Sequence, residues 1–349
     1  KFVPCLPINY MIVQENISLL PFNTFGIEVN AKYFCTISSK EELLETIAAI
    51  SPSLHPPFFL GSGSNVLLCK DIDGCVIKNE IKGIEIINED KEWVWIKSFS
   101  GTIWHDLVLY GIENNFGGIE NMSLIPGTVG AAPIQNIGAY GVELKDTFVE
   151  LEAIDISTGE TKIFSKEKCQ FGYRDSIFKR IAKGKYFIYS ITLKLSKQPV
   201  VNMSYGDIHK VLLHQQITQP TIKDISNAII EIRQSKLPDP KILGNAGSFF
   251  KNPEISSAEL ERLQAVFSDI PYYKLNNGKV KIPAGWLIEQ CGWKGKQIGH
   301  TGNHAKQALV IVNYGNATGN EIWEHAQNVQ QSIQQKFGIF IEAEVNIIR

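Results

Sequence analysis

The sequence predicts an α+β protein with more than one domain. Its 349 residues exceed the roughly 100–200 residues of a typical single domain, so two or three domains with a well-buried core are expected. The first half contains mostly short runs of β-branched and aromatic residues, which are typical of strands. The last third alternates helical and strand patterns and predicts a smaller αββαβ unit.

Local patterns predict the elements of the first half. Residues 38–50 predict a helix, because Ser39 is a suitable N-cap, Glu42 follows three residues later, and the apolar residues have helical spacing. Residues 103–114 carry apolar side chains at i, i+3, i+4 and i+7 and predict a helix that packs on a sheet. The strands predicted in this half are residues 56–60, 74–78, 93–97, 149–157 and 186–196.

A domain junction is expected near residue 236. Residues 225–236 have helical apolar spacing and end before Pro238, and the run 237–253 that follows is punctuated by proline and glycine. The elements predicted beyond this junction are helices over 256–267, 284–292 and 321–338, and strands over 307–313 and 339–348.

Composition and charge exclude several classes of protein. The 34 Lys and Arg against 36 Asp and Glu give a formal charge of −2, so neither nucleic-acid binding nor an anionic membrane surface is indicated. The six cysteines form no C-x-x-C pair, which favours reduced thiols over disulfides or a zinc site and predicts a cytoplasmic protein. No run of 18 apolar residues predicts a membrane span. Met11 is a suitable native start, so residues 1–10 are interpreted as a non-native or upstream extension.

Two glycine-rich segments are the main indication of a ligand site. Residues 117–141 hold six of the 28 glycines in 25 positions, and the loop 61–65 (GSGSN) follows a predicted strand. Glycine lets the backbone approach a ligand closely, and successive N–H groups in such turns bind phosphate. We expect a ligand at the longer run, whereas tight turns alone are the alternative for the shorter one. No third glycine completes a dinucleotide fingerprint after Gly63 and no Walker sequence is present, which disfavours a Rossmann domain and phosphoryl transfer from ATP.

A few polar residues in apolar surroundings are candidates for chemistry. Arg174 is suited to bind a substrate carboxylate through a bidentate fork, and a structural ion pair with Asp175 or another acid is the alternative. Ser248 precedes two phenylalanines that would seat it at a domain wall, although most serines in such turns only cap a helix or bond the backbone. Glu342 and Glu344 share one face of the last predicted strand, so one is expected to face solvent and the other to be buried.

Longer motifs resemble the UDP-N-acetylenolpyruvoylglucosamine reductase family over nearly all of residues 20–349. In chain order these motifs are NTFGI (23–27), GSGSNVL (61–67), LIPGTVGAAPIQNIGAYGVE (124–143), FGYRDSIFK (171–179), KLPDPK (236–241), GNAGSFFKNP (244–253), AGWLIEQCGWKG (284–295) and EAEV (342–345). The family is cytoplasmic and FAD-dependent. It reduces UDP-N-acetylglucosamine enolpyruvate to UDP-N-acetylmuramate with NADPH as co-substrate, in the synthesis of peptidoglycan precursors for the bacterial cell wall.

The resemblance implies a vanillyl-alcohol-oxidase-type (PCMH-type) fold, in which a two-part FAD-binding region is joined to a smaller α/β substrate-binding domain. The FAD-binding region would span about 27–198. The implied domains are 11–80 and 81–235 for the two FAD-binding subdomains, 236–338 for the substrate-binding domain, and 339–349 for a C-terminal strand that returns to the active site.

The resemblance also implies the FAD-binding residues. Backbone N–H groups of the glycine-rich segments would hold the FAD pyrophosphate and ribityl chain, and Arg233 would add a cationic contact. No histidine lies in these segments, so FAD is expected to be noncovalent. The expected FAD-binding residues are Gly61, Gly63, Ser64, Asn65, Val66, Leu67, Pro126, Gly127, Thr128, Gly130, Ala131, Gln135, Asn136, Ile137, Gly138, Ala139 and Arg233.

The family's catalytic arginine, serine and glutamate correspond to Arg174, Ser248 and Glu344. The implied reaction is ping-pong: hydride passes from NADPH to flavin N5 and then to C3 of the enolpyruvyl group, and a proton reaches C2. Arg174 would stabilise negative charge that develops on the substrate carboxylate, and Ser248 would donate the proton. A charged Glu344 would repel that carboxylate, so it is expected to be protonated or to orient a neighbouring donor.

Substrate contacts follow from the same resemblance. Segment 201–210 (VNMSYGDIHK) resembles the loop of the family type that places a tyrosine over the substrate, which makes Tyr205 the covering residue. Lys236 and Asn252 correspond to contacts with the UDP-sugar diphosphate, and Gln307 is expected to line the site, whereas contacts within 292–304 are unassigned. We expect a monomer that binds only small molecules and holds no metal. The alternatives from other classes are a flavin oxidase that uses oxygen and a catalytically silent nucleotide-sugar-binding module.

Overall fold

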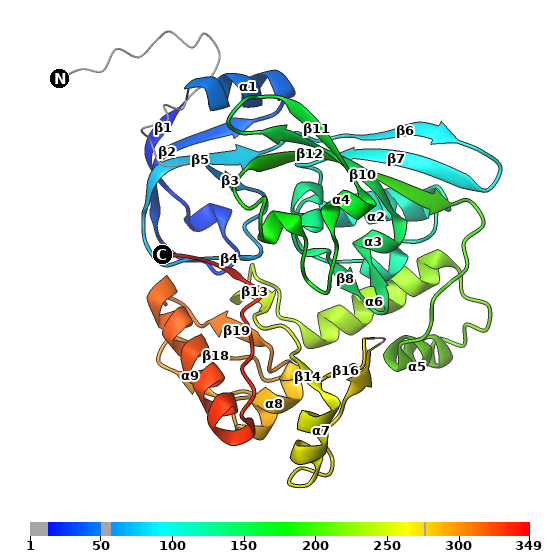
Figure 1. The fold of residues 1–349 in the computed structure, drawn as a ribbon, viewed down its shortest axis with the longest axis vertical. Helices are drawn as coiled ribbons and strands as arrows, with labels where there is room; N and C mark the ends of the chain where they lie inside the picture. Colours follow the sequence, from blue (N-terminus) through cyan, green and yellow to red (C-terminus); the bar gives the residue numbers. More distant parts are fainter. Residues whose placement is uncertain (1–12, 50–56, 276) are drawn as a thin grey trace. The chain divides into compact units, whose positions relative to one another are not determined.

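The structure is a computed structural model, and it forms two compact units (Figure 1). The expected extension over residues 1–10 lies outside the described residues. No helix within the described part of the chain is both long and apolar enough to cross a membrane. The residues described are 13–49, 57–275 and 277–349.

The two units do not simply follow the order of the chain. The first unit contains Asn30–Ser62 and Ile72–Arg233, with the described residues before Ser18. The second unit combines the C-terminal part, Gln234–Arg349, with the two short segments Ser18–Val29 and Gly63–Asp71. The GSGSN loop is therefore divided between the units after Ser62.

A four-stranded sheet forms one part of the first unit. Its strand order is β1 (Gln14–Ser18), β2 (Asn30–Ile37), β5 (Ile72–Asn79) and β3 (Phe58–Leu60). Strands β2 and β3 both run parallel to β5, and α1 (Lys40–Ala49) follows β2. Ser39 caps α1 as predicted, since its hydroxyl accepts the Glu42 N–H at 3.1 Å, while the Glu42 carboxylate accepts the Ser38 N–H at 2.6 Å.

A five-stranded antiparallel sheet forms the other part of the first unit (Figure 1). Along β7 (Trp93–Phe99) buried and half-buried side chains alternate, and the β-branched and aromatic residues of this segment are what predicted the strand. The inner residues of this sheet share a core with α2 (Trp104–Glu113) and α3 (Leu144–Thr147). The strand order is β11 (Thr161–Ser165), β10 (Phe148–Asp155), β12 (Tyr186–Ser196), β7 (Trp93–Phe99) and β6 (Ile84–Glu89).

The remaining elements of the first unit carry the loops of interest. The glycine-rich run contains a 3₁₀ helix, Val129–Gln135, and the hairpin of β8 (Gly138–Ala139) and β9 (Val142–Glu143). Helices α5 (Gly206–His214) and α6 (Ile222–Lys236) share a separate apolar cluster, and α4 (Lys166–Cys169) precedes Arg174.

The second unit contains a four-stranded antiparallel sheet, one face of which is covered by α9 (Gly319–Phe337) (Figure 1). A three-stranded sheet carries α7 (Ser257–Gln264) and leads into α8 (Ala284–Gln290). C-terminal β20 (Asn346–Ile348) runs parallel to β4 (Val66–Leu68). The strand orders are β13 (Gly244–Ser248), β19 (Val310–Asn313), β18 (Thr301–Asn303), β17 (Gln297–Ile298) for the first sheet, and β14 (Glu254–Ser256), β16 (Lys279–Lys281), β15 (Tyr273–Lys274) for the second.

The structure adds one strand to this unit and shortens two predicted ones. The run 237–253, for which no strand was predicted, contains β13, which pairs with β19. The strand predicted over 339–348 is regular only at β20, because residues 339–345 make a single β-bridge, between Ala343 and Phe250. The strand predicted from residue 307 begins at Val310, because the Val310 N–H bonds the Gln307 carbonyl in a turn.

Candidate active site

The two glycine-rich segments predicted to bind a cofactor meet in the first unit. A Cβ added to Gly61 would lie only 2.6 Å from Oγ1 of Thr128, and one added to Gly130 would lie 2.6 Å from Cβ of Ser100. Glycine is thus required at both positions because protein segments pack closely there. The close approach inferred from sequence exists, but at these two glycines it is made by the protein itself.

Helix α2 fixes the course of the glycine-rich run. The Trp104 N–H donates to the Gly127 carbonyl at 3.0 Å, and its indole Nε1 donates to the Met122 carbonyl at 3.1 Å. His105 Nδ1 accepts the Leu124 N–H at 3.0 Å, and Leu124 adopts a left-handed φ of 58°. Burial lowers the pKa of His105, which favours the neutral ring that this bond needs.

Two buried polar groups of the first unit are suited to an anionic cofactor. Among the described residues, Ser62 Oγ and Arg233 Nε are buried and have no hydrogen-bond partner. Burial lowers the pKa of Arg233, since the charged form loses solvent, and Tyr140 opposes this effect. A buried donor and a buried cation without a counter-charge are stabilised by a bound phosphate group. These residues therefore fit the FAD diphosphate implied by the sequence motifs.

The remainder of the GSGSN loop lies in the second unit and contacts the N-terminal motif NTFGI. Gly63 has a left-handed φ of 63°, and a Cβ there would overlap the Phe22 carbonyl oxygen. The Thr24 N–H donates to the Gly63 carbonyl at 3.1 Å, and the Thr24 carbonyl accepts the Asn245 N–H at 2.9 Å. Thr24 thus joins this loop to β13, the strand that ends at Ser248.

Arg174 lies against the glycine-rich run. Its guanidinium donates to the carbonyl oxygens of Gly138 at 2.5 Å and Asn136 at 3.5 Å, and its φ of 52° is left-handed. Asp175, the ion-pair partner that was the sequence alternative for Arg174, pairs with Arg180 at 3.0 Å. Arg174 is therefore oriented by the same backbone that was predicted to bind FAD.

Asn136 organises the two loops around Arg174. It is fully buried, and its Nδ2 donates to the Gly172 carbonyl at 3.0 Å and to Glu143 Oε2 at 3.1 Å. Its Oδ1 accepts the Lys145 N–H at 3.0 Å. Asn136 was expected to contact FAD through its backbone, and its side chain has this structural role in addition.

Ser248 and Glu344 lie on neighbouring segments of the second unit. The Glu344 N–H donates to the Phe249 carbonyl at 2.7 Å, directly after Ser248. Phe249 and Phe250 are buried, as predicted, while Ser248 is exposed at the end of β13. Ser248 is thus an accessible hydroxyl on a rigid apolar base.

Glu342 faces solvent, as was expected for one of the two glutamates, whereas Glu344 is less buried than expected. The side chain of Glu342 is 66% exposed and pairs with Lys251 at 3.1 Å, whereas Glu344 is half-buried. Asn65 contacts the backbone around Glu344: its Nδ2 lies 3.4 Å from the Glu344 carbonyl, and its own carbonyl accepts the Asn346 N–H at 3.1 Å. The GSGSN loop therefore also holds the segment that bears Glu344.

Two predicted substrate contacts converge at the start of α8. Asn252 Oδ1 accepts the Ala284 N–H at 2.9 Å, and a Cβ on Gly285 would lie 3.5 Å from Gln307 Oε1. Lys236 ends α6.

Tyr205 lies in the first unit beside the glycine-rich run. It immediately precedes α5, is 45% exposed, and meets the ring of Tyr140 edge-on at a centroid distance of 5.5 Å. Burial raises the pKa of Tyr140, so its hydroxyl stays protonated at neutral pH.

The basic segment 292–304 has a structural explanation. Lys296 Nζ lies 4.2 Å from the centroid of the Trp293 ring, and Trp293 packs edge-on against His325. His325 is 3% exposed and bonds Thr301 Oγ1 at 3.0 Å and Asn303 Oδ1 at 2.8 Å. Burial, followed by the charge of Lys296, lowers the pKa of His325 to about 4.

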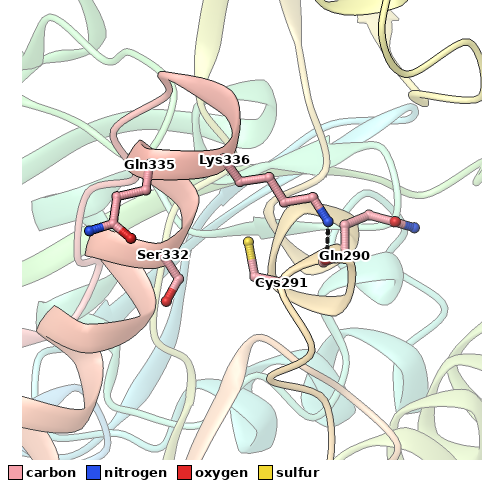
Figure 2. Close-up of a pocket in the computed structure, with 5 residues that line it drawn as sticks. All are labelled: Gln290, Cys291, Ser332, Gln335 and Lys336. Atoms are coloured by element: carbon pink, nitrogen blue, oxygen red, sulfur yellow. Dashed lines mark hydrogen bonds between the residues drawn. The ribbon is translucent and has the colours of Figure 1, made fainter.

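A hollow of about 350 Å³ lies between α8 and α9 of the second unit (Figure 2). Lys336 Nζ donates to the Gln290 carbonyl across it at 2.5 Å, which satisfies a carbonyl at the end of α8. None of the predicted site residues lines this hollow. Its lining residues are Gln290, Cys291, Ser332, Gln335 and Lys336.

Comparison with known proteins gives matches to both parts of the chain. A protein-family model described as an FAD binding domain matches residues 31–165, and one described as the C-terminal domain of UDP-N-acetylenolpyruvoylglucosamine reductase matches residues 239–348. The UDP-N-acetylenolpyruvoylglucosamine reductase of Flavobacterium johnsoniae is 55% identical over 339 residues, 97% of this chain and 100% of that protein. The protein of the same name from Amoebophilus asiaticus is 51% identical over 341 residues, with 97% and 100% covered.

The fold resembles that of a solved reductase structure. The crystal structure of UDP-N-acetylenolpyruvylglucosamine reductase from Thermus caldophilus superposes with a TM-score of 0.67 at 24% identity, and the match covers 97% of this chain and 100% of that chain. At this level of identity the likeness concerns the fold.

Proposed function

The chain belongs to the UDP-N-acetylenolpyruvoylglucosamine reductase family, and we propose that it reduces UDP-N-acetylglucosamine enolpyruvate to UDP-N-acetylmuramate with NADPH as the hydride donor. It is an FAD-dependent oxidoreductase of peptidoglycan precursor synthesis. The observation that carries this conclusion is 55% identity over 97% of the chain. The predicted α+β FAD-binding fold with a smaller C-terminal domain is confirmed.

We propose that FAD is held noncovalently by the residues selected from sequence, with two groups that the structure emphasises. Ser62 Oγ and Arg233 Nε are buried without partners within the described residues, and Arg233 would offset the charge of the diphosphate. When bound, FAD supplies the hydride-transfer chemistry between NADPH and the enolpyruvyl group. The other proposed contacts are Gly61, Gly63–Leu67, Pro126–Thr128, Gly130, Ala131 and Gln135–Ala139.

Arg174 is proposed to stabilise the charge that develops during hydride addition. As C3 of the substrate gains hydride, negative charge moves through C2 into the carboxylate, and a fixed cation stabilises that state more than the ground state. Support comes from the left-handed backbone and the bonds to Gly138 and Asn136, which fix the direction of the guanidinium.

Ser248 is proposed to deliver the proton to C2. Its exposed position on two buried phenylalanines supports the role, because a proton donor must be accessible and precisely held. Glu344 is proposed to act protonated or by orienting a donor, since an ionised carboxylate would repel the charge on the substrate. Glu344→Gln tests this assignment: the amide should keep most of the substrate-dependent activity.

The nucleotide sugar is proposed to be bound by Tyr205, Lys236, Asn252 and Gln307, in the family type that has a tyrosine over the substrate. The exposed ring of Tyr205 and the convergence of Asn252 and Gln307 at the start of α8 support these assignments. The lysine would contact the diphosphate through its charge.

Further assignments concern the whole protein. We propose FAD-binding subdomains at 11–80 and 81–235, a substrate-binding domain at 236–338, and a C-terminal segment, 339–349, that carries Glu344. We also propose a cytoplasmic monomer.

NADPH oxidation tests the proposed function. The purified protein should oxidise NADPH rapidly when the enolpyruvyl nucleotide is present and only slowly in air without it. Fast oxygen-dependent turnover without the nucleotide would indicate an oxidase, and a protein that binds the nucleotide without turnover would indicate a silent binding module. NADH in place of NADPH tests the choice of co-substrate.

A further inference from the structure

Asn121 connects two loops of the first unit through one side chain. It lies in the 3₁₀ helix Glu120–Met122 and is 0% exposed. Its Nδ2 donates to the Tyr140 carbonyl at 3.0 Å and to the Asn202 carbonyl at 3.1 Å. Tyr140 lies near the end of the glycine-rich run 117–141, and Asn202 belongs to the segment that leads to Tyr205.

The orientation of this amide is fixed by its partners. With Nδ2 between two carbonyl oxygens both amide hydrogens are donated, whereas the flipped amide would place Oδ1 against two acceptors. Oδ1 is buried and has no hydrogen-bond partner in the described part of the chain. A buried amide that leaves its own acceptor unpaired, yet gives both hydrogens to different loops, is placed to hold those loops together.

Other contacts join the same two loops. The Tyr140 and Tyr205 rings meet edge-on at 5.5 Å. Within the segment that leads to Tyr205, Ser204 donates both its N–H, at 3.0 Å, and its hydroxyl, at 2.7 Å, to Asn202 Oδ1. A Cβ on Gly141 would lie 3.2 Å from Ser204 Oγ, so the loops are in close contact. Asn202 is thus the residue through which Asn121 acts on the turn that precedes Tyr205.

We propose that Asn121 is a positioning residue that holds the Tyr205 segment on the glycine-rich run and thereby tightens binding of the nucleotide sugar. The link to binding rests on the proposed role of Tyr205 as the covering residue. Asn121 does not contact the substrate in this account. The alternative is that Asn121 only stabilises its own 3₁₀ turn.

Asn121→Asp tests the proposal, because the isosteric carboxylate turns an oxygen toward the two carbonyls and removes both bonds. Hydrogen exchange of the segment 199–206 should become faster, and KM for the enolpyruvyl nucleotide should rise about tenfold, as expected for two lost hydrogen bonds. NADPH-driven flavin reduction should stay near its native rate. Asn114→Asp is the matched control, since Asn114 is exposed and donates to a single carbonyl, that of Tyr110, at 2.8 Å.

A double-mutant cycle with Tyr205→Ala separates positioning from local stabilisation. In the Tyr205→Ala background, Asn121→Asp should raise KM no further. An equal rise in both backgrounds, or unchanged exchange of 199–206, would overturn the proposal. If Tyr205→Ala leaves KM unchanged, the role of Tyr205 is wrong, and the exchange of 199–206 alone decides whether Asn121 holds the segment. Should Asn121→Asp not bind FAD, Asn121→Ala removes the same donors without adding charge.

Discussion

The buried histidine of the second unit predicts a specific loss of stability in mild acid. The pKa of His325 falls from 6.5 to about 4 on folding, with burial as the largest cause and Lys296 as the second. Between these values the unfolded chain binds a proton that the folded chain does not, so stability falls as pH drops from about 6.5 to about 4. The full difference between the two pKa values corresponds to about 3 kcal/mol of unfolding free energy. About 2 kcal/mol of this stability is lost between pH 7.5 and pH 5.

His325→Gln removes this titration while keeping a donor and an acceptor for Asn303 and Thr301. Urea unfolding, followed by tryptophan fluorescence at pH 7.5 and pH 5, measures the free energy of unfolding in each protein. The difference between the two pH values should be about 2 kcal/mol smaller in the variant than in the native protein. His214→Gln, at the exposed last residue of α5, is the comparison substitution. If the free energy of unfolding depended equally on pH in the native protein and in His325→Gln, His325 would not be the cause of the loss of stability.

Three further predictions concern the chemistry. Acid or heat precipitation should release FAD into the supernatant, about one per chain, because no histidine in the glycine-rich segments offers a covalent link, and colour kept in the pellet would contradict this. Ser248→Ala should be reduced by NADPH at a near-native rate but reoxidised by the nucleotide about 10²–10⁴-fold more slowly, as stopped-flow absorbance will show; equal slowing of both steps would make Ser248 structural. Tyr205→Phe and Lys236→Met should raise KM for the nucleotide, with the larger effect at the lysine, and an unchanged KM in both would remove their assignment.

Much of the first unit could be predicted because its strands are rich in β-branched and aromatic residues, and one of them also alternates. The strand predicted over 186–196 matches β12 at both ends, and its inner side chains are buried against α2 and α3. The second unit was less predictable. Strand β13 consists of Gly, Asn, Ala, Gly and Ser, which have little strand propensity, and only pairing with β19 makes it a strand.

Residues 339–345 were predicted as part of a strand, but they do not form one. Their alternation of apolar and polar side chains is real, because Ile341 is buried and Glu342 exposed, yet an extended chain that makes one β-bridge shows the same alternation as a paired strand. An alternating sequence pattern indicates which side chains face the core. It does not show whether the segment pairs with another strand, because the partner lies far along the chain.

For the site, motif resemblance selected residues but could not supply their partners. Arg174 and Ser248 were selected as candidates, while the bonds that orient Arg174 run to residues 36 and 38 positions away. Thr24 and Asn121 were not selected, because a threonine or an asparagine in a turn looks ordinary until its distant partners are known. The same is true of Ser62, whose interest lies in a hydroxyl without a partner among the described residues.

We propose that the enolpyruvyl nucleotide receives hydride at C3 and a proton at C2. The positions of deuterium in the product test this proposal. The enzyme should be reduced with NADPH deuterated at the transferred position, mixed with the nucleotide without oxygen, and the product examined by NMR in ordinary and in heavy water. We expect UDP-N-acetylmuramate with NADPH-derived deuterium at C3 and solvent deuterium at C2. A reduced flavin that persists in the presence of the nucleotide, or product without solvent deuterium at C2, would contradict it.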